Sequence, residues 1–187
     1  REAIVIDAPG GAYEWASRLA ESAGCELRAL LLTHGHWDHT LDAHAFADKG
    51  VAIYAHRDDR ELIENPAVMS DFAMPGLEMK PARVNHWVDT GDVIALLGQQ
   101  FEVRHVPGHC PGNILFYDAV GERAFVGDVI FAGSVGRFDL PGGDFSTLQQ
   151  SIKQQVYTLP DSTELLPGHG PTTTVAEEKA NNPYVRA

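Results

Sequence analysis

The heptapeptide at residues 33–39, Thr-His-Gly-His-Trp-Asp-His, places four potential metal ligands within six positions. It follows an apolar run, residues 29–32, which predicts a buried strand. Three imidazoles and a carboxylate at the tip of such a strand need charge or hydrogen-bond partners, and a divalent metal supplies both. His34 and His36 can point the same way from an extended segment, whereas Asp38 and His39 follow a turn. One ion held by all four would be strained, so the spacing favours two neighbouring ions.

The length of 187 residues fits one domain, residues 1–187, with its own hydrophobic core. The chain begins with Arg1 rather than Met and enters a strand almost at once, which is compatible with a missing N-terminal strand or strands of the first sheet. No apolar stretch approaches the roughly 20 residues that a membrane span needs, and no signal-like segment points to export. Two isolated cysteines, Cys25 and Cys110, fit a reducing compartment, so we expect a cytoplasmic protein without a membrane partner.

The formal charge of −12 argues against nucleic acid as the main partner, because phosphate binding needs a basic surface. A site with two divalent ions, two carboxylates and one hydroxide nevertheless keeps about one positive charge. Anionic or strongly polarised small molecules are therefore compatible with the acidic chain. The oligomeric state is not readable from the sequence.

Strand and helix patterns alternate through both halves, which predicts an α+β fold with two packed mixed sheets and helices outside. Strands are expected at residues 4–6, 29–32, 51–55, 92–97, 100–106, 113–118, 122–127 and 164–166. Helices are expected at residues 12–23, 39–49, 57–64 and 145–159, with a last short helix capped by Thr174 and Glu177. Residues 66–85 show no clear period, which predicts an irregular connection or lid.

Three further segments share one layout, in which an apolar strand is followed by a small-residue turn and then by a ligand-type residue. These segments end at His109, Asp128 and His169. A rigid ligand at the end of a strand, with glycine allowing close approach, is how a scaffold builds a metal site. A single histidine in such a place is more often structural. The three together with the heptapeptide predict a metal centre.

With Asp7 at the end of the first strand, this order of residues resembles the metallo-β-lactamase superfamily over essentially the whole chain. The resemblance implies an αββα sandwich with a dinuclear site at one edge. By the same resemblance, the first metal is held by His34, His36 and His109. The second is held by Asp38, His39 and His169, and Asp128 is the bridging carboxylate. Asp7 is similar to an aspartate that orients a ligand histidine rather than binding metal.

The implied chemistry is metal-assisted hydrolysis. A hydroxide between two divalent ions is nucleophilic at neutral pH, because the metals lower the pKa of bound water from 15.7 toward about 7. Asp38 is also placed to accept a hydrogen bond from that hydroxide and aim it. Zinc is the expected metal, since imidazole and carboxylate suit it, and iron or manganese are the alternatives.

Within the superfamily, Trp37 and residues 127–144 are similar to the short glyoxalase II-like proteins, which hydrolyse thioesters of the S-2-hydroxyacylglutathione type. Arg137 either fixes an anionic substrate group or pairs with Asp139 or Asp144. Only 18 residues follow His169 (187 minus 169), so the helical domain that binds glutathione in full-length glyoxalase II is not expected here. The true thioester or ester therefore stays open.

Three alternatives stand beside the thioesterase. They are a mononuclear-iron persulfide dioxygenase, a phosphodiesterase or other hydrolase of the same fold, and a non-catalytic metal-binding module. The complete ligand set favours two metals and hydrolysis. Four histidines lie outside the metal pattern: His44, His56, His86 and His105. His56 and His105 are candidates for supporting a ligand, His86 for a loop, and Cys110 for packing.

Overall fold

The computed structural model describes residues 1–186 and divides into two compact units. Unit 1 is Arg1–Val88, and unit 2 begins at Asp89. Each unit has its own buried core, which includes Leu30 and Phe46 in unit 1 and Leu148 and Ile152 in unit 2. No helix within residues 1–186 is long and apolar enough to cross a bilayer.

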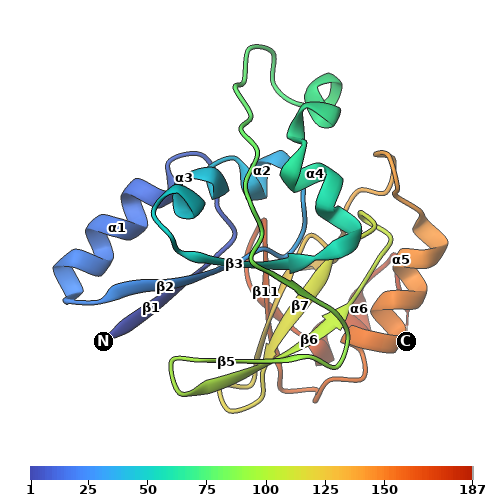
Figure 1. The fold of residues 1–187 in the computed structure, drawn as a ribbon. Helices are drawn as coiled ribbons and strands as arrows, with labels where there is room; N and C mark the ends of the chain where they lie inside the picture. Colours follow the sequence, from blue (N-terminus) through green and yellow to red (C-terminus); the bar gives the residue numbers. More distant parts are fainter. Residues whose placement is uncertain (187) are drawn as a thin grey trace. The chain divides into compact units, whose positions relative to one another are not determined.

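Unit 1 is built on a four-stranded sheet in which neighbouring strands are all parallel. Its order is β1 (Glu2–Ile6), β2 (Glu26–Leu31), β3 (Ala52–His56) and β4 (His86–Val88). Helices α1 (Ala12–Ala23) and α3 (Ala43–Asp48) lie together on one face of this sheet (Figure 1). The sheet is parallel because each strand returns through a crossover on that side. The sequence analysis predicted mixed strand directions in both sheets. The sheet of unit 1 is parallel instead, and the six-stranded sheet of unit 2 is the mixed one.

Three predictions for unit 1 need refinement. The helix expected over 39–49 is two short helices, α2 (Trp37–Thr40) and α3. The chain turns between them because Asp42 is tied to α1: its carboxylate accepts a hydrogen bond from the backbone nitrogen of Tyr13 at 2.6 Å. His86, expected in a loop, lies in β4 with its ring stacked on that of Tyr54, the centroids 4.4 Å apart.

The helix expected at 57–64 consists of a 3-10 turn, η1 (Arg57–Asp59), and α4 (Arg60–Glu64). A further 3-10 segment, η2 (Pro66–Phe72), begins at the proline that ends α4. Residues 73–85 form the irregular connection that the sequence predicts, and this segment projects from the rest of unit 1 (Figure 1). Its projecting course exposes Met74, at 59%.

Unit 2 contains a six-stranded sheet in the order β12-β11-β8-β7-β6-β5. The strands are β5 (Val93–Leu96), β6 (Gln99–His105), β7 (Ile114–Asp118), β8 (Arg123–Gly127), β11 (Glu164–Pro167) and β12 (Thr173–Thr174). Strands β11 and β8 are parallel neighbours, and the other pairs are antiparallel. Because β8 and β11 run in the same direction, the residues that follow them meet at one edge of the sheet.

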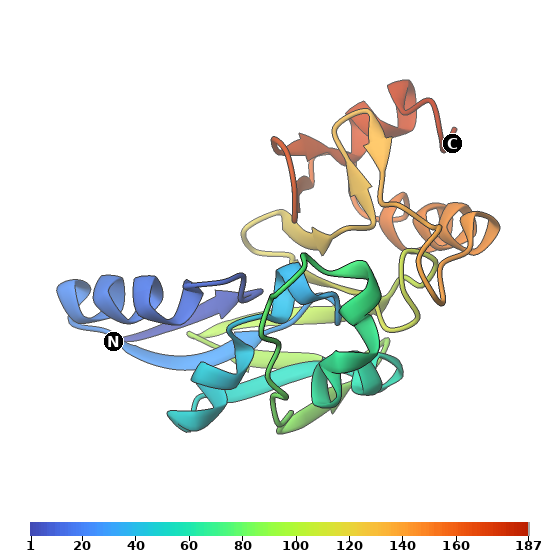
Figure 2. The ribbon, with the colours of Figure 1, turned by 90° about the horizontal axis from the view of Figure 1, so that it is seen from above.

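The helices of unit 2 are α5 (Phe145–Ser151), continued by a π-helical turn η3 (Ile152–Val156), and α6 (Val175–Asn181). The predicted cap of α6 is confirmed, because the Thr174 hydroxyl accepts a hydrogen bond from the backbone nitrogen of Glu177 at 3.2 Å. A small hairpin, β9 (Ile130–Phe131) and β10 (Ser134–Val135), lies near α6 (Figure 2). Like β12, its strands have two residues each, too few to show an alternating pattern.

Candidate metal centre

Asp7 organises the ligand-type residues of unit 1. It follows β1 directly and has a φ of +58°, a left-handed conformation that is uncommon outside glycine. Its Oδ1 accepts a hydrogen bond from the backbone nitrogen of Thr33 at 2.7 Å, and its Oδ2 accepts one from the Thr33 hydroxyl at 2.8 Å. The carboxylate is therefore fixed against the residue that precedes the histidine motif.

Two histidines take their orientation from Asp7. The Nδ1 atom of His39 lies 2.8 Å from Oδ2 of Asp7, so that nitrogen donates its proton to the carboxylate and Nε2 is left to ligate. The Nδ1 atom of His34 lies 3.1 Å from the Thr33 hydroxyl oxygen, which in turn donates to Asp7. Asp7 thus contacts His39 directly and reaches His34 through Thr33, whose part the sequence analysis missed.

The four ligand-type residues of the motif lie close together. The ring centroid of His34 is 4.8 Å from that of His36 and 4.1 Å from that of His39. Oδ2 of Asp38 is 3.8 Å from Nε2 of His39. The three histidines are buried and Asp38 is half-buried. The expectation that His34 and His36 point the same way is consistent with this spacing.

Gly35, which stands between His34 and His36 in the chain, packs closely against Leu62 and Asp59. A Cβ atom there would lie 2.6 Å from the Cβ of Leu62 in α4. Its backbone nitrogen donates to Oδ2 of Asp59 at 2.7 Å, and Asp59 is fully buried. Asp59 therefore fixes the backbone of the histidine motif through this hydrogen bond, a role that no spacing in the sequence reveals.

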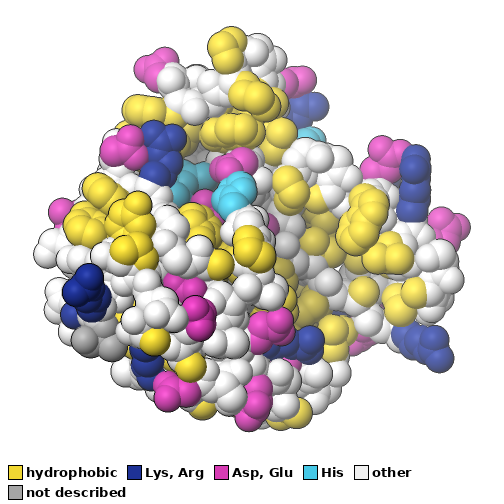
Figure 3. All heavy atoms as spheres, turned by 180° about the vertical axis from the view of Figure 1, so that it is seen from behind, with side chains coloured by type: hydrophobic (Ala, Val, Ile, Leu, Met, Phe, Trp, Pro, Cys, Tyr) yellow, Lys and Arg dark blue, Asp and Glu magenta, His cyan; other side chains and the backbone are white. Residues whose placement is uncertain are grey.

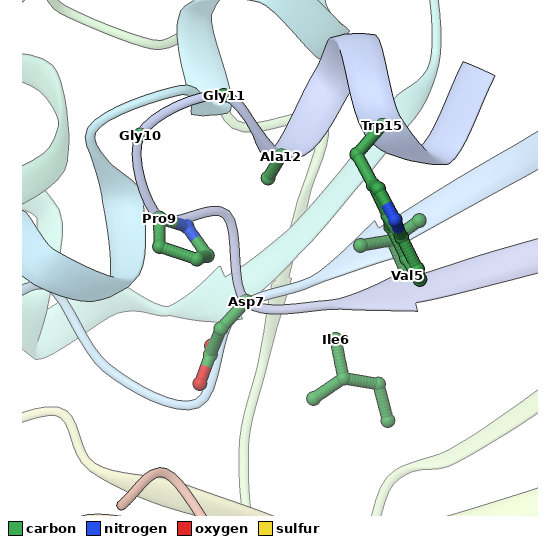
Figure 4. Close-up of a pocket in the computed structure, with 8 residues that line it drawn as sticks. All are labelled: Val5, Ile6, Asp7, Pro9, Gly10, Gly11, Ala12 and Trp15. Carbon is green, nitrogen blue, oxygen red and sulfur yellow. The ribbon is translucent and has the colours of Figure 1, made fainter. Parts of the chain in front are cut away.

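A pocket of about 350 Å³ opens beside Asp7 (Figure 4). The end of β1, the turn at Pro9–Gly11 and the start of α1 bound it, and the side chains of Val5 and Trp15 contribute to its lining. Its lining is mostly apolar, apart from Asp7. The pocket therefore borders Asp7, whose carboxylate contacts His39.

Unit 2 supplies the other predicted ligands at the ends of β6, β8 and β11. Oδ2 of Asp128 lies 3.8 Å from Nε2 of His109 and 3.5 Å from Nε2 of His169. Nδ1 of His109 lies 2.7 Å from the carbonyl oxygen of Arg137, to which it donates, so its Nε2 faces Asp128. A Cβ at Gly136 would lie 1.8 Å from the carbonyl oxygen of Asp128, so glycine is needed for this approach.

The distances within each unit suit a shared cation. Ligand atoms 2.0–2.2 Å from a tetrahedral ion are about 3.4 Å from one another. The pairs Asp128–His169, Asp128–His109 and Asp38–His39, at 3.5, 3.8 and 3.8 Å, are near that edge length and longer than direct hydrogen bonds. Imidazole and carboxylate are also the donors that zinc, iron and manganese accept. The donor set of each unit thus fits a divalent metal.

Arg137 pairs with Asp139 rather than with Asp144. Its guanidinium makes two hydrogen bonds of 2.9 Å to the Asp139 carboxylate, and this pairing holds the pKa of Asp139 at about 2. The same pairing raises the pKa of Arg137. Asp144 instead caps α5 through the backbone nitrogen of Thr147, which lowers the pKa of its carboxyl. The second of the two roles expected for Arg137 therefore describes this structure.

The histidines outside the pattern have other neighbours. His44 lies 3.2 Å from the carbonyl oxygen of Leu41, and His56 accepts a hydrogen bond from the backbone nitrogen of Asp58 at 3.2 Å. Nε2 of His105 lies 2.7 Å from the carbonyl oxygen of Pro111. Cys110 is fully buried, which agrees with a packing role.

The comparisons with known proteins agree with this reading of the fold. The family model described as the metallo-beta-lactamase superfamily matches residues 1–169. The chain is 38% identical to the hydroxyacylglutathione hydrolase GloC of Haemophilus influenzae, covering 100% of this chain and 89% of that protein. The chain therefore belongs to the metallo-β-lactamase superfamily, and it is a metallo-hydrolase of that superfamily.

Solved structures show the same fold. The crystal structure of the BLEG-1 B3 metallo-beta-lactamase matches with a TM-score of 0.90 at 34% identity, covering 100% of this chain and 90% of that one. That of TTHA1623 in a di-iron-bound form matches with a TM-score of 0.84 at 37% identity, covering 96% and 88%. The predicted superfamily and its α+β sandwich fold class are thus confirmed.

Proposed function

We propose that this chain is a dinuclear-metal hydrolase of thioesters or esters, of the S-2-hydroxyacylglutathione type. The observation that carries the proposal is that both halves of the superfamily's ligand set are present, each with its orienting contacts. In unit 1, Asp7 orients His39, and in unit 2 the Arg137 carbonyl orients His109. We propose that the two units form one domain, residues 1–187, in which these half-sets hold two ions.

The metal assignments follow the superfamily pattern. His34, His36 and His109 would hold one ion, and Asp38, His39 and His169 the other, with Asp128 shared between them. Two bound divalent ions supply a hydroxide nucleophile at neutral pH and polarise the substrate carbonyl. Zinc is the first choice. The di-iron form of TTHA1623 makes iron the main alternative.

The remaining work falls to the chain's own side chains. The Asp7 carboxylate keeps Nε2 of His39 free of the proton that Nδ1 carries. Asp38, which is half-buried beside His39, is the group placed to accept a proton from the attacking water. The burial of His39 keeps bulk water from its hydrogen bond to Asp7, which strengthens that interaction.

The identity to GloC supports the substrate class. The net charge of −12 supports a small-molecule substrate rather than nucleic acid. On the face drawn in Figure 3, Lys and Arg side chains are scattered among Asp and Glu rather than gathered in a basic patch. The isolated cysteines Cys25 and Cys110 support the cytoplasmic location that the sequence suggests.

The testing experiment combines metal analysis with turnover of S-D-lactoylglutathione before and after chelation. We expect about two metals per chain, hydrolysis that chelation abolishes, and restoration when metal is returned. Asp128→Asn should lose activity, whereas Asp48→Asn, a matched change at an exposed carboxylate, should keep it. Two bound metals without turnover would exclude S-D-lactoylglutathione as the substrate and leave the assignment as a dinuclear-metal hydrolase in place. One iron with oxygen consumption on glutathione persulfide would overturn the proposal in favour of a dioxygenase.

A second candidate activity is β-lactam hydrolysis, which the likeness to BLEG-1 favours. A chromogenic cephalosporin, which tests β-lactam hydrolysis, and bis(p-nitrophenyl) phosphate, which tests phosphodiester hydrolysis, should be assayed beside the thioester. A kcat/KM for either one above that for the thioester would move the assignment to a β-lactamase or to a phosphodiesterase, respectively.

A further inference from the structure

One buried carboxylate in unit 2, that of Glu178, contacts two of the three loops that carry candidate ligands there, those of Asp128 and His169. Glu178 is 1% exposed and lies on α6, outside the superfamily's ligand pattern. One loop runs from Asp128 into the β9–β10 hairpin, and the other runs from His169 to β12. Glu178 lies where these two loops approach α6.

Each loop donates a hydrogen bond to this carboxylate. The backbone nitrogen of Gly133, in the turn of the hairpin, lies 3.1 Å from Oε2 and 3.3 Å from Oε1. The hydroxyl of Thr173, in β12, donates to Oε1 at 2.7 Å. Glu178 therefore links a residue five positions after Asp128 to a residue four positions after His169.

Asn182 completes the connection. Its amide nitrogen donates to Oε2 of Glu178 at 2.8 Å and to the carbonyl oxygen of Ser134 at 3.0 Å, and its side chain is buried. The hairpin also contacts His169 itself, because the Phe131 ring meets the His169 ring edge-on with centroids 6.2 Å apart. His169 is the most exposed candidate ligand of unit 2, with 56% of its side chain exposed, whereas His109 and Asp128 are buried.

The position needs a carboxylate rather than an amide. Glu178 accepts from the Gly133 nitrogen, the Thr173 hydroxyl and the Asn182 amide, and all three are donors. A glutamine would point its own NH₂ donors at one of them and leave a buried donor without an acceptor, which is costly. The negative charge also affects Tyr157: burial, and then Glu178, raise the pKa of that phenol to about 12.

We propose that Glu178 is a positioning residue that fixes Asp128 and His169 at the separation a shared metal ion requires. The inference rests on the proposed function, because it concerns the ion held by Asp38, His39, Asp128 and His169. The ion held by His34, His36 and His109 shares only Asp128 with it, so it depends on Glu178 through one ligand rather than two. Glu178 itself contacts neither substrate nor metal.

The test compares Glu178→Gln with Glu177→Gln, which makes the same chemical change on the exposed side of the same helix. The affinity of each metal equivalent is measured by stepwise competition with a chelator. Loss of an outer hydrogen bond to a metal ligand typically lowers affinity 10- to 100-fold. We expect a loss of that size for one equivalent in Glu178→Gln, with the other equivalent changed much less and Glu177→Gln matching the wild type.

Thr173→Val is the milder variant if Glu178→Gln does not fold, because it removes only the bond on the His169 side. It should weaken the same equivalent by a smaller factor. Unchanged affinities in both folded variants, or an equal loss of both equivalents, would overturn the inference while the proposed function stands.

A wild-type chain that binds fewer than two metals would overturn the proposed function instead. The imidazole NMR signals of His169 in the metal-free proteins then decide the positioning role. These signals should shift or broaden in Glu178→Gln and Thr173→Val, and not in Glu177→Gln. Identical His169 signals in all of these proteins would overturn the inference independently of any metal.

Discussion

His39 and Asp7 are 32 positions apart in the chain, and Nδ1 of the histidine lies 2.8 Å from Oδ2 of the aspartate. The same carboxylate accepts two hydrogen bonds from Thr33. The parallel pairing of β1 with β2 produces this contact, because it brings the carboxyl ends of both strands to one edge of the sheet. Asp7 thus connects the first strand to the histidine motif.

Asp7→Asn should weaken metal binding while preserving the backbone. Asparagine tolerates the left-handed φ of +58° at this position, but its amide presents donors where the carboxylate accepts three hydrogen bonds. We expect a 10- to 100-fold loss of affinity for the metal that His39 holds, measured by chelator competition. Asp48→Asn is the control, and equal affinities in the two variants would contradict the role of Asp7.

Gly136→Ala should disrupt the candidate ligands of unit 2 without altering any of them. The added methyl would lie 1.8 Å from the carbonyl oxygen of Asp128 and 3.0 Å from Nδ1 of His109, so the backbone must move. Overpacking of this kind costs about 1–3 kcal/mol. The free energy of unfolding, measured with denaturant, and the metal content should both fall. Gly98→Ala, where the methyl meets open space, should lose some stability through its φ of +73° but keep its metals.

Tyr157 should make stability decline at high pH. Its hydroxyl donates to the carbonyl oxygens of Glu178 and Val185, and the pKa of the phenol is raised to about 12 from 10.0. Because the folded pKa lies above the unfolded value, the stabilisation is complete below pH 10 and is lost as pH rises toward 12. Urea unfolding across that range should show a steeper decline for the wild type than for Tyr157→Phe. Parallel declines would contradict this account.

Removal of Arg137 should return Asp139 to ordinary titration. The guanidinium holds the pKa of Asp139 at about 2, below the ordinary aspartate value of 3.8. In Arg137→Gln the pKa should rise toward 3.8, as measured by NMR titration of the carboxyl carbon. In the wild type, the pairing is present above pH 4 and is lost as pH falls toward 2, since the folded pKa is the lower one. An unchanged pKa would show that Arg137 is oriented toward another group in solution.

The candidate ligands were predictable from the sequence because strand, turn and ligand residue recur in one fixed order. Asp7, His109, Asp128 and His169 each follow a recognisable apolar strand, and the helical cap at Thr174 has a standard spacing. Such local patterns depend on neighbouring residues alone. The strand ends of β1, β2, β8 and β11 therefore lie close to where the sequence indicates.

The supporting contacts were not predictable, because they join residues far apart in sequence through side chains with no periodic signal. Asp59 binds the nitrogen of Gly35 from 24 positions away, and Glu178 binds that of Gly133 from 45 positions away. The helix break at Asp42 likewise depends on a bond to Tyr13. For Thr33, its place directly before the first histidine was the one available signal.

The division of the ligand set between the two units bears on how the protein is made. Unit 1, with its own core and with His34, His36, Asp38 and His39, is complete at Val88, whereas the candidate ligands of unit 2 are translated later. Folding during synthesis proceeds from the N-terminal side. A nascent chain thus displays a half-set of ligands before its complement exists. In the proposed centre, the ligand set is therefore complete only after translation has passed His169.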